Sequence, residues 1–332
     1  MNNTQPIKFL VVRFSSIGDI ILTTPVVRCI HQQVQGSIVH YLTKQQFVPL
    51  MEHNPAIAKV YGYDKNWPEL MAQLLNEQYD FIIDLHHNLR TSRLISRLKA
   101  PAFRFYKLNI AKWLLVNLRI NILPGIHIVD RYMETVSIFD VKNDGQGLDY
   151  FIPSSDEVDL RTLPAFLHQG FIGIVAGAKH NTKQMPEDKL IDLCIRLNRP
   201  VILLGGKEDA ERAGQIAAAS GSHVFNGCGR FTLHQSASLV RQAKLIITPD
   251  TGLMHIAAAF KKNILSVWGN TIPEFGMYPY LPGSGSFVYE VKGLRCRPCS
   301  KLGYKKCPRN HFKCMNQIAW DDIIHRSQTL FA

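Results

Sequence analysis

The feature that most constrains the fold is a short apolar run near the N-terminus, followed by a polar loop and a helical pattern. Phe9 to Val12 is apolar throughout, which is typical of a buried parallel strand. Ser15, Ser16 and Gly18 interrupt the run, and apolar residues then recur at helical spacing from Ile20 to Ile30. Gly18 also lets the backbone approach a ligand closely. This order of strand, loop and helix predicts the first unit of an open α/β sheet.

Asp19 lies at the junction between this strand and this helix. The unpaired N–H groups of a first helical turn stabilise a carboxylate, so one interpretation is that Asp19 only caps the helix. The carboxyl end of a first strand is also where open α/β sheets meet their ligands. This stretch alone leaves both interpretations open.

The same alternation continues along the chain and predicts parallel βαβ units in two halves. The expected strands are 37–43, 79–85, 171–176, 201–204, 245–248 and 264–268, and helices are expected over 67–78 and 188–197. Residues 142–168 are polar and rich in Gly and Pro, which is typical of a connection between domains. A length of 332 residues suits two domains. We expect them over 1–155 and 165–315, with a C-terminal helix over 316–332.

The chain carries a formal net charge of +12, which predicts an acidic partner such as nucleic acid, an anionic membrane surface or a phosphorylated ligand. No apolar run approaches the roughly 20 residues that a membrane helix needs. Asn2 to Gln5 is polar, which argues against a signal peptide and favours the cytoplasm. Residues 104–123 mix basic and large apolar side chains, which fits an ordinary surface helix or a patch for an acceptor or a membrane surface.

Four of the seven cysteines, Cys296, Cys299, Cys307 and Cys314, cluster near the C-terminus, with His311 nearby. Structural disulfides are rare in the cytosol, so the cluster predicts either metal binding or reduced packing thiols. A C-x-x-C pair with two further ligands can hold tetrahedral zinc. The later spacings are irregular, so reduced thiols remain the default and zinc the alternative.

A phosphate-binding pattern occurs where an expected strand passes into an Ala-rich helix, at Asp250-Thr251-Gly252-Leu253-Met254-His255. Thr251 and Gly252 would offer backbone N–H groups and a hydroxyl at a helix N-terminus, an arrangement that binds phosphate oxygens. Asp250 suits a cap or a ribose contact better than a phosphate contact, because like charges repel. The alternative is a plain turn and cap.

Two further residues of this half have the chemistry of a nucleotide-sugar site. Lys183, in a loop after a strand, could neutralise a diphosphate leaving group, although a lone loop lysine is usually only solvated. Asp209 follows Gly205-Gly206 at a strand end, where carboxylates accept hydrogen bonds from ribose hydroxyls. No G-x-G-x-x-G follows the first strand, there is no G-x-x-x-x-G-K-[ST] loop, and no D-x-D stands at a strand end.

Taken together, several motifs resemble those of the heptosyltransferase family, the ninth glycosyltransferase family. They are Ser15-Ser16-Ile17-Gly18-Asp19, Thr182-Lys183-Gln184-Met185-Pro186, Asp250 to His255, and Cys296-x-x-Cys299 with His311-Phe312-Lys313-Cys314. Their order and spacing together are more specific than any one of them. Many members have Trp-Pro where this chain has Met185-Pro186, a departure that affects the nearby nucleotide contact.

The resemblance implies a GT-B architecture, in which two Rossmann-like domains face each other across a cleft. It implies a metal-independent, inverting transfer without a cofactor, with Asp19 as the base and Lys183 on the diphosphate. The implied nucleotide-sugar contacts are Thr182, Lys183, Asp209, Asp250, Thr251, Gly252, Leu253 and His255. For the acceptor we expect contacts from Ser15, Ser16, Gly18, Asn88, Arg90 and Arg93.

The resemblance implies ADP-heptose as the donor, but its acceptor side matches less well. The basic residues of the N-terminal half predict an anionic acceptor, such as lipopolysaccharide core or a related lipid-linked glycan. The expected setting is the cytoplasm, with peripheral contact to the inner-membrane surface and no nucleic-acid partner. Two other classes stay open: a different nucleotide-sugar enzyme on the same fold, such as an epimerase, and a binding protein for anionic glycans without catalysis. Asp19 favours the transferase, because a binding protein has no need of a base.

Overall fold

The computed structural model describes residues 6–64 and 66–331. The chain divides into two compact units, unit 1 (Met1–Leu108 and Ile126–Phe151) and unit 2 (Asn109–Gly125 and Ile152–Ala332). Residues 109–125 fall within the range expected for the first domain, but their contacts are with unit 2. Asn2 to Gln5, which argued against a signal peptide, lie outside the described residues.

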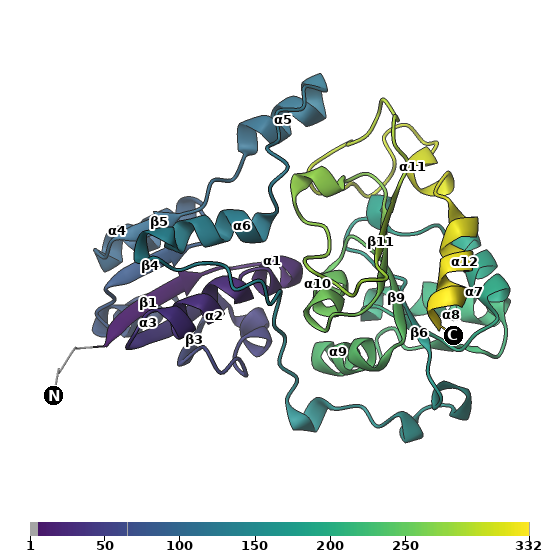
Figure 1. Cartoon of the computed structure of the whole chain (residues 1–332), viewed down its shortest axis with the longest axis horizontal. Coiled ribbons are helices and arrows are strands. Elements are labelled where there is room, and N and C mark those ends of the chain that lie inside the picture. Colours follow the sequence, from purple (N-terminus) through teal and green to yellow (C-terminus); the bar gives the residue numbers. More distant parts are fainter. Residues whose placement is uncertain (1–5, 65, 332) are drawn as a thin grey trace. The chain divides into compact units, whose positions relative to one another are not determined.

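Unit 1 is built on a five-stranded parallel sheet of order β3-β2-β1-β4-β5 (Figure 1). Its strands are β1 (Ile7–Val12), β2 (Ser37–Lys44), β3 (Lys59–Tyr63), β4 (Phe81–Asp84) and β5 (Ala102–Arg104). Its helices are α1 (Ile17–Ile21), α2 (Thr24–Gln33), α3 (Trp67–Asn76), α4 (Leu89–Leu98) and α6 (Ile128–Met133). Short 3₁₀ segments occupy Gln45–Leu50 and Glu134–Phe139.

The first strand lies at the centre of this sheet because it is apolar on both faces. Phe9 to Val12 is fully buried, as the unbroken apolar run predicted. Val12 pairs with Leu42 of β2 and with Asp84 of β4. The loops that follow these three strands therefore start from the same edge of the sheet, and Asp19 lies in the first turn of α1, directly after the first of these loops.

The single helix expected after this loop is two helices. The break falls at Leu22 and Thr23, where the N–H of Thr23 bonds to the carbonyl of Ile20. Pro25 then occupies the first turn of α2. Proline has no N–H to donate and clashes with the preceding turn, so one continuous helix cannot pass through it. The helical spacing was correct, but the proline signal was missed.

The chain returns from residues 109–125 to unit 1 at Ile126, and the buried side chain of Arg28 binds the returning chain at residues 144–149. Arg28 on α2 forms an ion pair with Asp144 at 2.7 Å and another with Asp149. The Nη2 of Arg28 also donates to the carbonyl of Gly147 at 2.8 Å. These bonds fix the polar segment 144–149, which the sequence predicted only as part of a connection.

Unit 2 is built on a six-stranded parallel sheet of order β11-β10-β9-β6-β7-β8. Its strands are β6 (Ile172–Val175), β7 (Val201–Leu204), β8 (Val224–Asn226), β9 (Leu245–Pro249), β10 (Ile264–Trp268) and β11 (Phe287–Glu290). Its helices are α5 (Asn109–Leu118), α7 (Glu187–Leu197), α8 (Ala210–Ser220), α9 (Leu233–Gln242), α10 (Gly252–Ala259), α11 (Lys313–Asn316) and α12 (Trp320–Phe331). Its 3₁₀ segments are Ser154–Asp156, Leu160–Thr162, Ala165–Leu167, Asn181–Lys183, Lys207–Asp209 and Pro273–Phe275.

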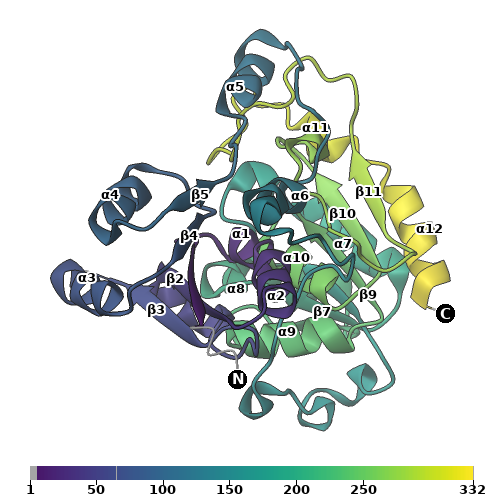
Figure 2. The same ribbon diagram turned by 60° about the vertical axis from the view of Figure 1, so that its left-hand side comes forward.

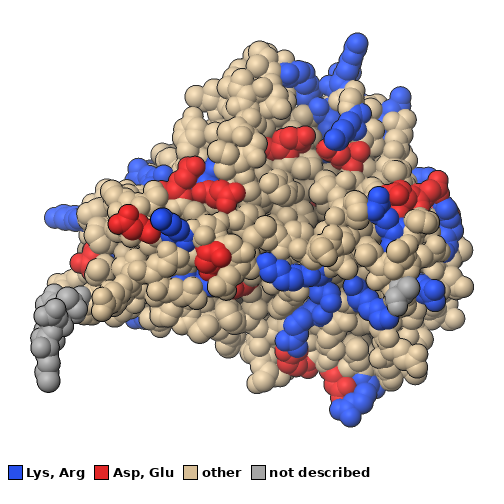
Figure 3. Space-filling model, viewed as in Figure 1, with Lys and Arg blue, Asp and Glu red and all other residues tan. Residues whose placement is uncertain are grey.

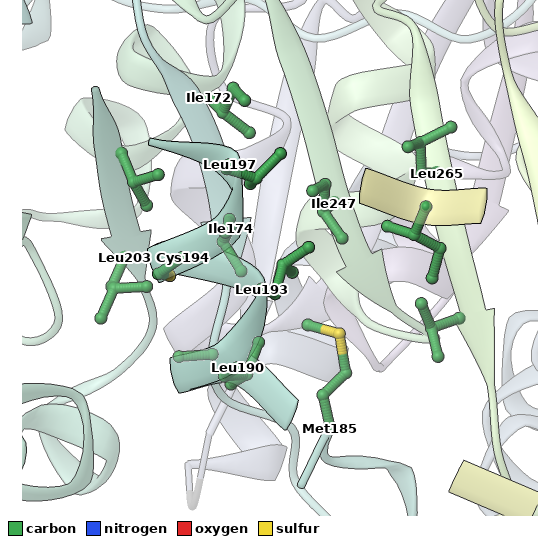
Figure 4. Packing of buried hydrophobic residues seen from close by; sticks show 14 of the residues in the cluster. Ile172, Ile174, Met185, Leu190, Leu193, Cys194, Leu197, Leu203, Ile247 and Leu265 are labelled. Atoms are coloured by element: carbon green, nitrogen blue, oxygen red, sulfur yellow. The ribbon is translucent and has the colours of Figure 1, made fainter. Parts of the chain in front are cut away.

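The core of unit 2 forms where α7 packs on the central strands. Leu190, Leu193 and Leu197 face Ile174 and its neighbours on the sheet (Figure 4). Met185, the residue at the departure from the family pattern, is fully buried in this cluster. Its flexible thioether fills a gap in the core, so its side chain packs internally.

The two parallel sheets confirm the predicted α/β class, and every strand expected from the sequence is present. Four strands were missed: β3, β5, β8 and β11. All four lie at or next to a sheet edge and are at most five residues long, so apolar periodicity is weak there. Within the described residues, no helix combines the length and the apolar character needed to cross a bilayer.

Candidate functional site

In unit 1, Asp19 is part of a tight polar cluster at the carboxyl end of β1. Its Oδ2 accepts hydrogen bonds from the backbone N–H of Ser16 at 3.1 Å and from the Ser16 hydroxyl at 2.7 Å. Its Oδ1 forms an ion pair with Arg13 at 2.5 Å. Asp19 therefore caps α1, but the strongest contact of the carboxylate is with Arg13, a residue that the sequence analysis did not single out.

Arg13 is a buried anchor for the first loop. Its Nε donates to the carbonyl of Ser15 at 2.9 Å, and its Nη1 donates to the carbonyl of Leu85, beyond β4, at 2.5 Å. Burial lowers the pKa of this guanidinium, but the carboxylate of Asp19, together with Tyr132, Tyr41 and Asp84, more than offsets that effect, so the net pKa is raised. Arg13 is therefore a permanent charge that holds the Asp19 carboxylate in place.

These contacts still leave Asp19 open to proton transfer. About 20% of its side chain is exposed, against 10% for Arg13. An ionised, oriented and partly exposed carboxylate can accept a proton from a bound hydroxyl.

The end of β4 adds two groups that the sequence did not identify. Asp84 is fully buried, and its Oδ1 accepts the N–H groups of His86 and His87 at 3.1 and 2.7 Å. Burial, together with the charges of Arg13 and Lys107, lowers the pKa of His86 to about 4. The His86 ring is therefore neutral at pH 7 and adds no positive charge beside Arg13.

The other residues expected to contact the acceptor differ in their hydrogen bonds and in their exposure to solvent. The side-chain oxygen of Asn88 caps α4, accepting from the N–H of Arg90 at 2.9 Å and of Thr91 at 3.0 Å. Arg90 and Arg93 follow on α4 with exposed side chains. Ser16 is exposed and Gly18 is buried. Asn88 thus positions the helix, while the two arginines are open to an anionic ligand.

In unit 2, Lys183 forms the centre of a second polar cluster. Its Nζ lies 2.5 Å from Oδ2 of Asp250, the residue directly after β9. The same oxygen accepts the hydroxyl of Thr271, which follows β10, at 3.0 Å. Lys183 ends the 3₁₀ turn after β6. Three loops at the carboxyl edge of this sheet are therefore joined through one carboxylate.

Thr182 and Tyr304 hold the lysine loop in place. The N–H and the hydroxyl of Thr182 both donate to the carbonyl of Tyr304 at 3.2 Å, and the N–H of Tyr304 donates to the Thr182 hydroxyl at 2.8 Å. Thr182 is buried by this arrangement. Its hydroxyl therefore fixes the backbone beside Lys183.

The phosphate-binding pattern lies at the start of α10, as expected. Thr251 is the N-cap residue, but its side chain makes no capping bond, and its hydroxyl lies 3.2 Å from that of Thr248. Gly252 and Leu253 are half-buried in the first turn, whereas His255 is buried inside the helix. Of the two roles expected for Asp250, the cap was wrong, because its carboxylate binds Lys183 and Thr271; the ribose contact stays a prediction.

Asp209 lies against the backbone of three glycines, Gly177, Gly205 and Gly206. Its Oδ2 accepts the N–H of Gly206 at 3.0 Å. A Cβ at Gly177 would lie 1.8 Å from this oxygen, and one at Gly205 would lie 2.9 Å from it. Burial raises the pKa of this carboxyl, with a partial offset from the Gly206 N–H. Only glycine at position 177 leaves room for this carboxylate.

The cysteine cluster of unit 2 is reduced. All seven cysteines lie in described residues and none forms a disulfide. Cys296 Sγ lies 3.7 Å from Nε2 of His311, and burial raises the pKa of Cys314 to about 12. Over residues 6–64 and 66–331, no three His, Cys, Asp or Glu side chains are arranged to hold a metal ion. The zinc alternative stays a hypothesis.

The residues that sequence patterns did not reveal are the supporting partners of the site rather than its partly exposed groups. Arg13, Thr271 and Tyr304 each hold a predicted site residue. The only signal for Arg13 was its position, a charged residue that directly ends an apolar strand. Thr271 and Tyr304 had no signal, because their partners are 21 and 122 residues away in sequence.

Comparison with known proteins identifies the family. The model of glycosyltransferase family 9 (heptosyltransferase) matches residues 67–301. Lipopolysaccharide heptosyltransferase 1 of Pseudomonas aeruginosa is 27% identical, over 89% of this chain and 86% of that protein. Lipooligosaccharide heptosyltransferase 2 of Haemophilus influenzae is 23% identical, over 89% of this chain and 92% of that protein.

Solved structures give the same result for the fold. The structure of Escherichia coli ADP-heptose lps heptosyltransferase II superposes with a TM-score of 0.74 at 19% identity, and the match covers 98% of each chain. This likeness confirms the predicted GT-B class. The match of the family model over most of the chain shows that this protein is a glycosyltransferase and belongs to family 9, the heptosyltransferases.

Proposed function

We propose that this enzyme transfers heptose from ADP-heptose to a lipopolysaccharide core acceptor by a single, inverting displacement that needs no metal ion and no cofactor. The observation that carries the proposal is the cluster in which Asp250 and Thr271 hold Lys183 at the carboxyl edge of the second sheet. A fixed ammonium there supplies the charge that a departing diphosphate requires.

The start of α10 supports the same role for this edge. A helix N-terminus offers N–H groups and a positive dipole end to phosphate oxygens, and no side-chain bond from Thr251 occupies this one. Gly252 and Leu253 would present backbone N–H groups to the diphosphate, and Asp209 would accept the ribose hydroxyls. Together with Lys183, these groups replace the charge that a metal ion would otherwise supply.

Asp19 is the proposed base. The acceptor oxygen attacks the anomeric carbon and passes its proton to the Asp19 carboxylate, while the bond from that carbon to the diphosphate oxygen breaks and ADP departs with the electron pair. The transition state has oxocarbenium character, as in glycoside hydrolysis. Arg13 does not touch the substrate in this scheme; it keeps the carboxylate ionised and oriented.

The proposed acceptor is an anionic, lipid-linked glycan, reached at the cytoplasmic face of the inner membrane, and nucleic acid is not a partner. Arg90 and Arg93, exposed on α4, are the proposed contacts for its acidic groups. Substituting both with Gln should raise the acceptor KM by about 10-fold and flatten its salt dependence. A change in the donor KM instead would contradict the assignment of these arginines.

The decisive test is to incubate the protein with ADP-heptose, with and without a core acceptor, and to measure ADP release and the anomeric configuration of the product. Release that depends on the acceptor, with inversion at the anomeric carbon, is the expected result. ADP release or sugar conversion without an acceptor would favour an epimerase-like enzyme. Binding of the acceptor without release would favour a non-catalytic glycan-binding protein.

A further inference from the structure

The positive charge of this protein is concentrated in two stretches that contain no acidic residue. Residues 85–129 and 291–320 hold 16 of the 38 Lys and Arg and none of the 26 Asp and Glu. The remainder of the chain therefore carries a net charge of −4. The proposed site residues Asp19, Lys183, Asp209 and Asp250 lie outside these stretches. Arg90 and Arg93, the proposed acceptor contacts, account for two of the 16 cations, which leaves most of the asymmetry unexplained by the site.

The two stretches meet in unit 2. Arg119, just after α5, donates to the carbonyl of Pro298 at 2.7 Å, and Lys301 reaches the carbonyl of Asn109 at 3.4 Å. Beneath them, Leu115 of α5 packs with Ile272 and Phe275. Residues 109–125 and 292–313 therefore form one surface, which we call the basic apolar surface. In Figure 3, which has the same view as Figure 1, Lys and Arg gather at the upper edge of the molecule. Figure 1 places α5 and the segment before α11 at that edge.

This surface also exposes large apolar side chains. Ile110 on α5 and Leu302 in the facing segment are each 68% exposed. The others on this surface are Trp113, Leu118, Ile120, Ile122 and Tyr304. Figure 2 shows α5 beside the chain that precedes α11 from a second direction. Scattered single exposures need no explanation, but a group of apolar side chains bordered by lysine and arginine marks an interaction site.

We infer that the basic apolar surface binds the headgroup region of an anionic lipid bilayer. Lys and Arg near such a membrane are attracted by its negative surface potential, and Trp, Ile and Leu insert at the boundary with the acyl chains. Nucleic acid would match the charge but leave Ile110, Leu118 and Ile122 in water. The inference rests on the proposed function in one respect only: a lipid-linked acceptor makes a bilayer the relevant surface.

The test is sedimentation of the full chain with vesicles of phosphatidylcholine containing about one third phosphatidylglycerol, compared with pure phosphatidylcholine. The charge variant is Lys301→Gln, Lys305→Gln and Arg309→Gln, all exposed. Each Lys or Arg near an anionic surface contributes roughly a factor of 5 in partitioning, so binding should fall by about 10²-fold. The matched control, Lys142→Gln, Arg161→Gln and Arg199→Gln, removes three exposed cations elsewhere and should bind as the unmodified protein does.

The apolar variant separates lipid from other acidic partners. Ile110→Ser, Leu118→Ser and Ile122→Ser should lower partitioning by at least 10-fold, because each loses burial of about three methylene-sized groups. The control Ile138→Ser with Ile195→Ser removes exposed apolar groups outside this surface. Equal binding to neutral and anionic vesicles, or equal losses in variant and control, would overturn the inference. The inference would also be overturned if the protein bound a single-stranded RNA more tightly than anionic vesicles and the apolar variant left that RNA binding unchanged.

Heptosyl transfer to a delipidated acceptor distinguishes this inference from the proposed function. The charge and apolar variants should keep their turnover on that soluble acceptor while losing vesicle binding. If the unmodified protein binds vesicles through this surface but transfers no sugar, the docking surface stands and the proposed function fails. If transfer occurs and vesicle binding does not depend on these residues, the function stands and the docking surface fails.

Discussion

The two units carry ion pairs of opposite design at the carboxyl edges of their sheets. In unit 1 the cation is the buried anchor: Arg13 bonds to two backbone carbonyls and leaves Asp19 the more exposed partner. In unit 2 the carboxylate is the anchor: Asp250 accepts both Lys183 and Thr271. One sheet therefore presents a carboxylate and the other presents an ammonium.

This difference follows from the chemistry that each edge is proposed to perform. A carboxylate that acts as a base must stay ionised, and a rigid guanidinium fork fixes it without competing for the proton. A phosphate contact must be a compact cation with rotatable donors, which a lysine supplies. The comparison predicts that the more exposed member of each pair controls rate and that its anchor controls position.

The largest effect is expected at Asp19. Asp19→Asn should lower kcat by about 10²–10⁴-fold, the usual range for a general base. It should also destabilise the protein by about 2–3 kcal/mol, because the buried Arg13 charge loses its partner. This stability loss revises what the sequence indicated, since a cap-only aspartate would tolerate asparagine. Kinetics and melting temperature measured on one preparation provide the check.

A matched variant separates the base from the anchor. Arg13→Gln removes the same ion pair but keeps the carboxylate. It should therefore lose comparable stability, while its kcat, measured on the folded protein, should fall by less than 10-fold. Equal losses of kcat in Arg13→Gln and Asp19→Asn would reduce Asp19 to a structural partner. A fully active Asp19→Asn enzyme would remove the base from the mechanism.

The second effect concerns Lys183. Lys183→Ala should lower kcat by about 10²-fold or more, the scale of one donor to a developing oxyanion. Activity of the unmodified enzyme should be unchanged in excess EDTA. Lys179→Ala, an exposed lysine in the same loop region, is the control and should be nearly silent. Loss of activity in EDTA that Mg²⁺ restores would refute the metal-independent scheme.

A smaller effect is expected from the anchor of that pair. Asp250→Asn keeps the shape of the side chain but loosens the hold on Lys183, so kcat/KM should fall by about 10-fold, the scale of one charged hydrogen bond. Thr271→Val, which removes only the hydroxyl partner, should cost less. Higher activity in Asp250→Asn would mean that the carboxylate mainly repels the diphosphate, which would reverse its assigned role.

The smallest effect on rate is expected at the opposite edge of the first sheet. Glu77 accepts the Tyr61 hydroxyl at 2.5 Å and pairs with Lys8 and Lys59. The Tyr61 hydrogen bond, aided by the two lysines, lowers the pKa of Glu77 to about 2. Because the folded pKa lies below the unfolded one, this stabilisation is present above about pH 5 and is lost as the pH falls toward 2.

Glu77→Gln should therefore cost about 1–2 kcal/mol at pH 7, after allowance for solvent screening, and leave kcat unchanged. Denaturant unfolding of the variant and the unmodified protein from pH 7 to pH 3 gives the measurement. The difference between them should shrink as the solution is acidified. A difference that does not depend on pH would mean that packing, rather than ionisation, is lost.

The proposed binding of this protein to a membrane also depends on a contrast, between where a segment lies in the sequence and which unit it packs on. Residues 109–125 leave unit 1 in sequence but pack on unit 2. Nothing in the local pattern of 104–123 distinguished this arrangement from an ordinary surface helix. The contacts of Arg119 and Lys301, which only the tertiary structure reveals, join the segment to the second acid-free stretch.

The sequence by itself determined the features that depend on local pattern. Buried parallel strands are long apolar runs, so β1, β7 and β10 were found directly. The partly exposed candidates Asp19, Lys183 and Asp250 were found because polar residues that follow such strands lie at the ligand-binding edge. Proline at position 25 could also have been interpreted correctly, because its effect on a helix is local.

Only the tertiary structure decided how these groups are held. Arg13 reaches Leu85, which is 72 residues away, and Lys183 meets Asp250, which is 67 residues away. Such pairings depend on which strand lies beside which, and periodicity carries no information about that order. The chemical groups of the site can thus be recognised from sequence, whereas their partners, and with them the charge state and orientation of each group, come from the packing of the sheets.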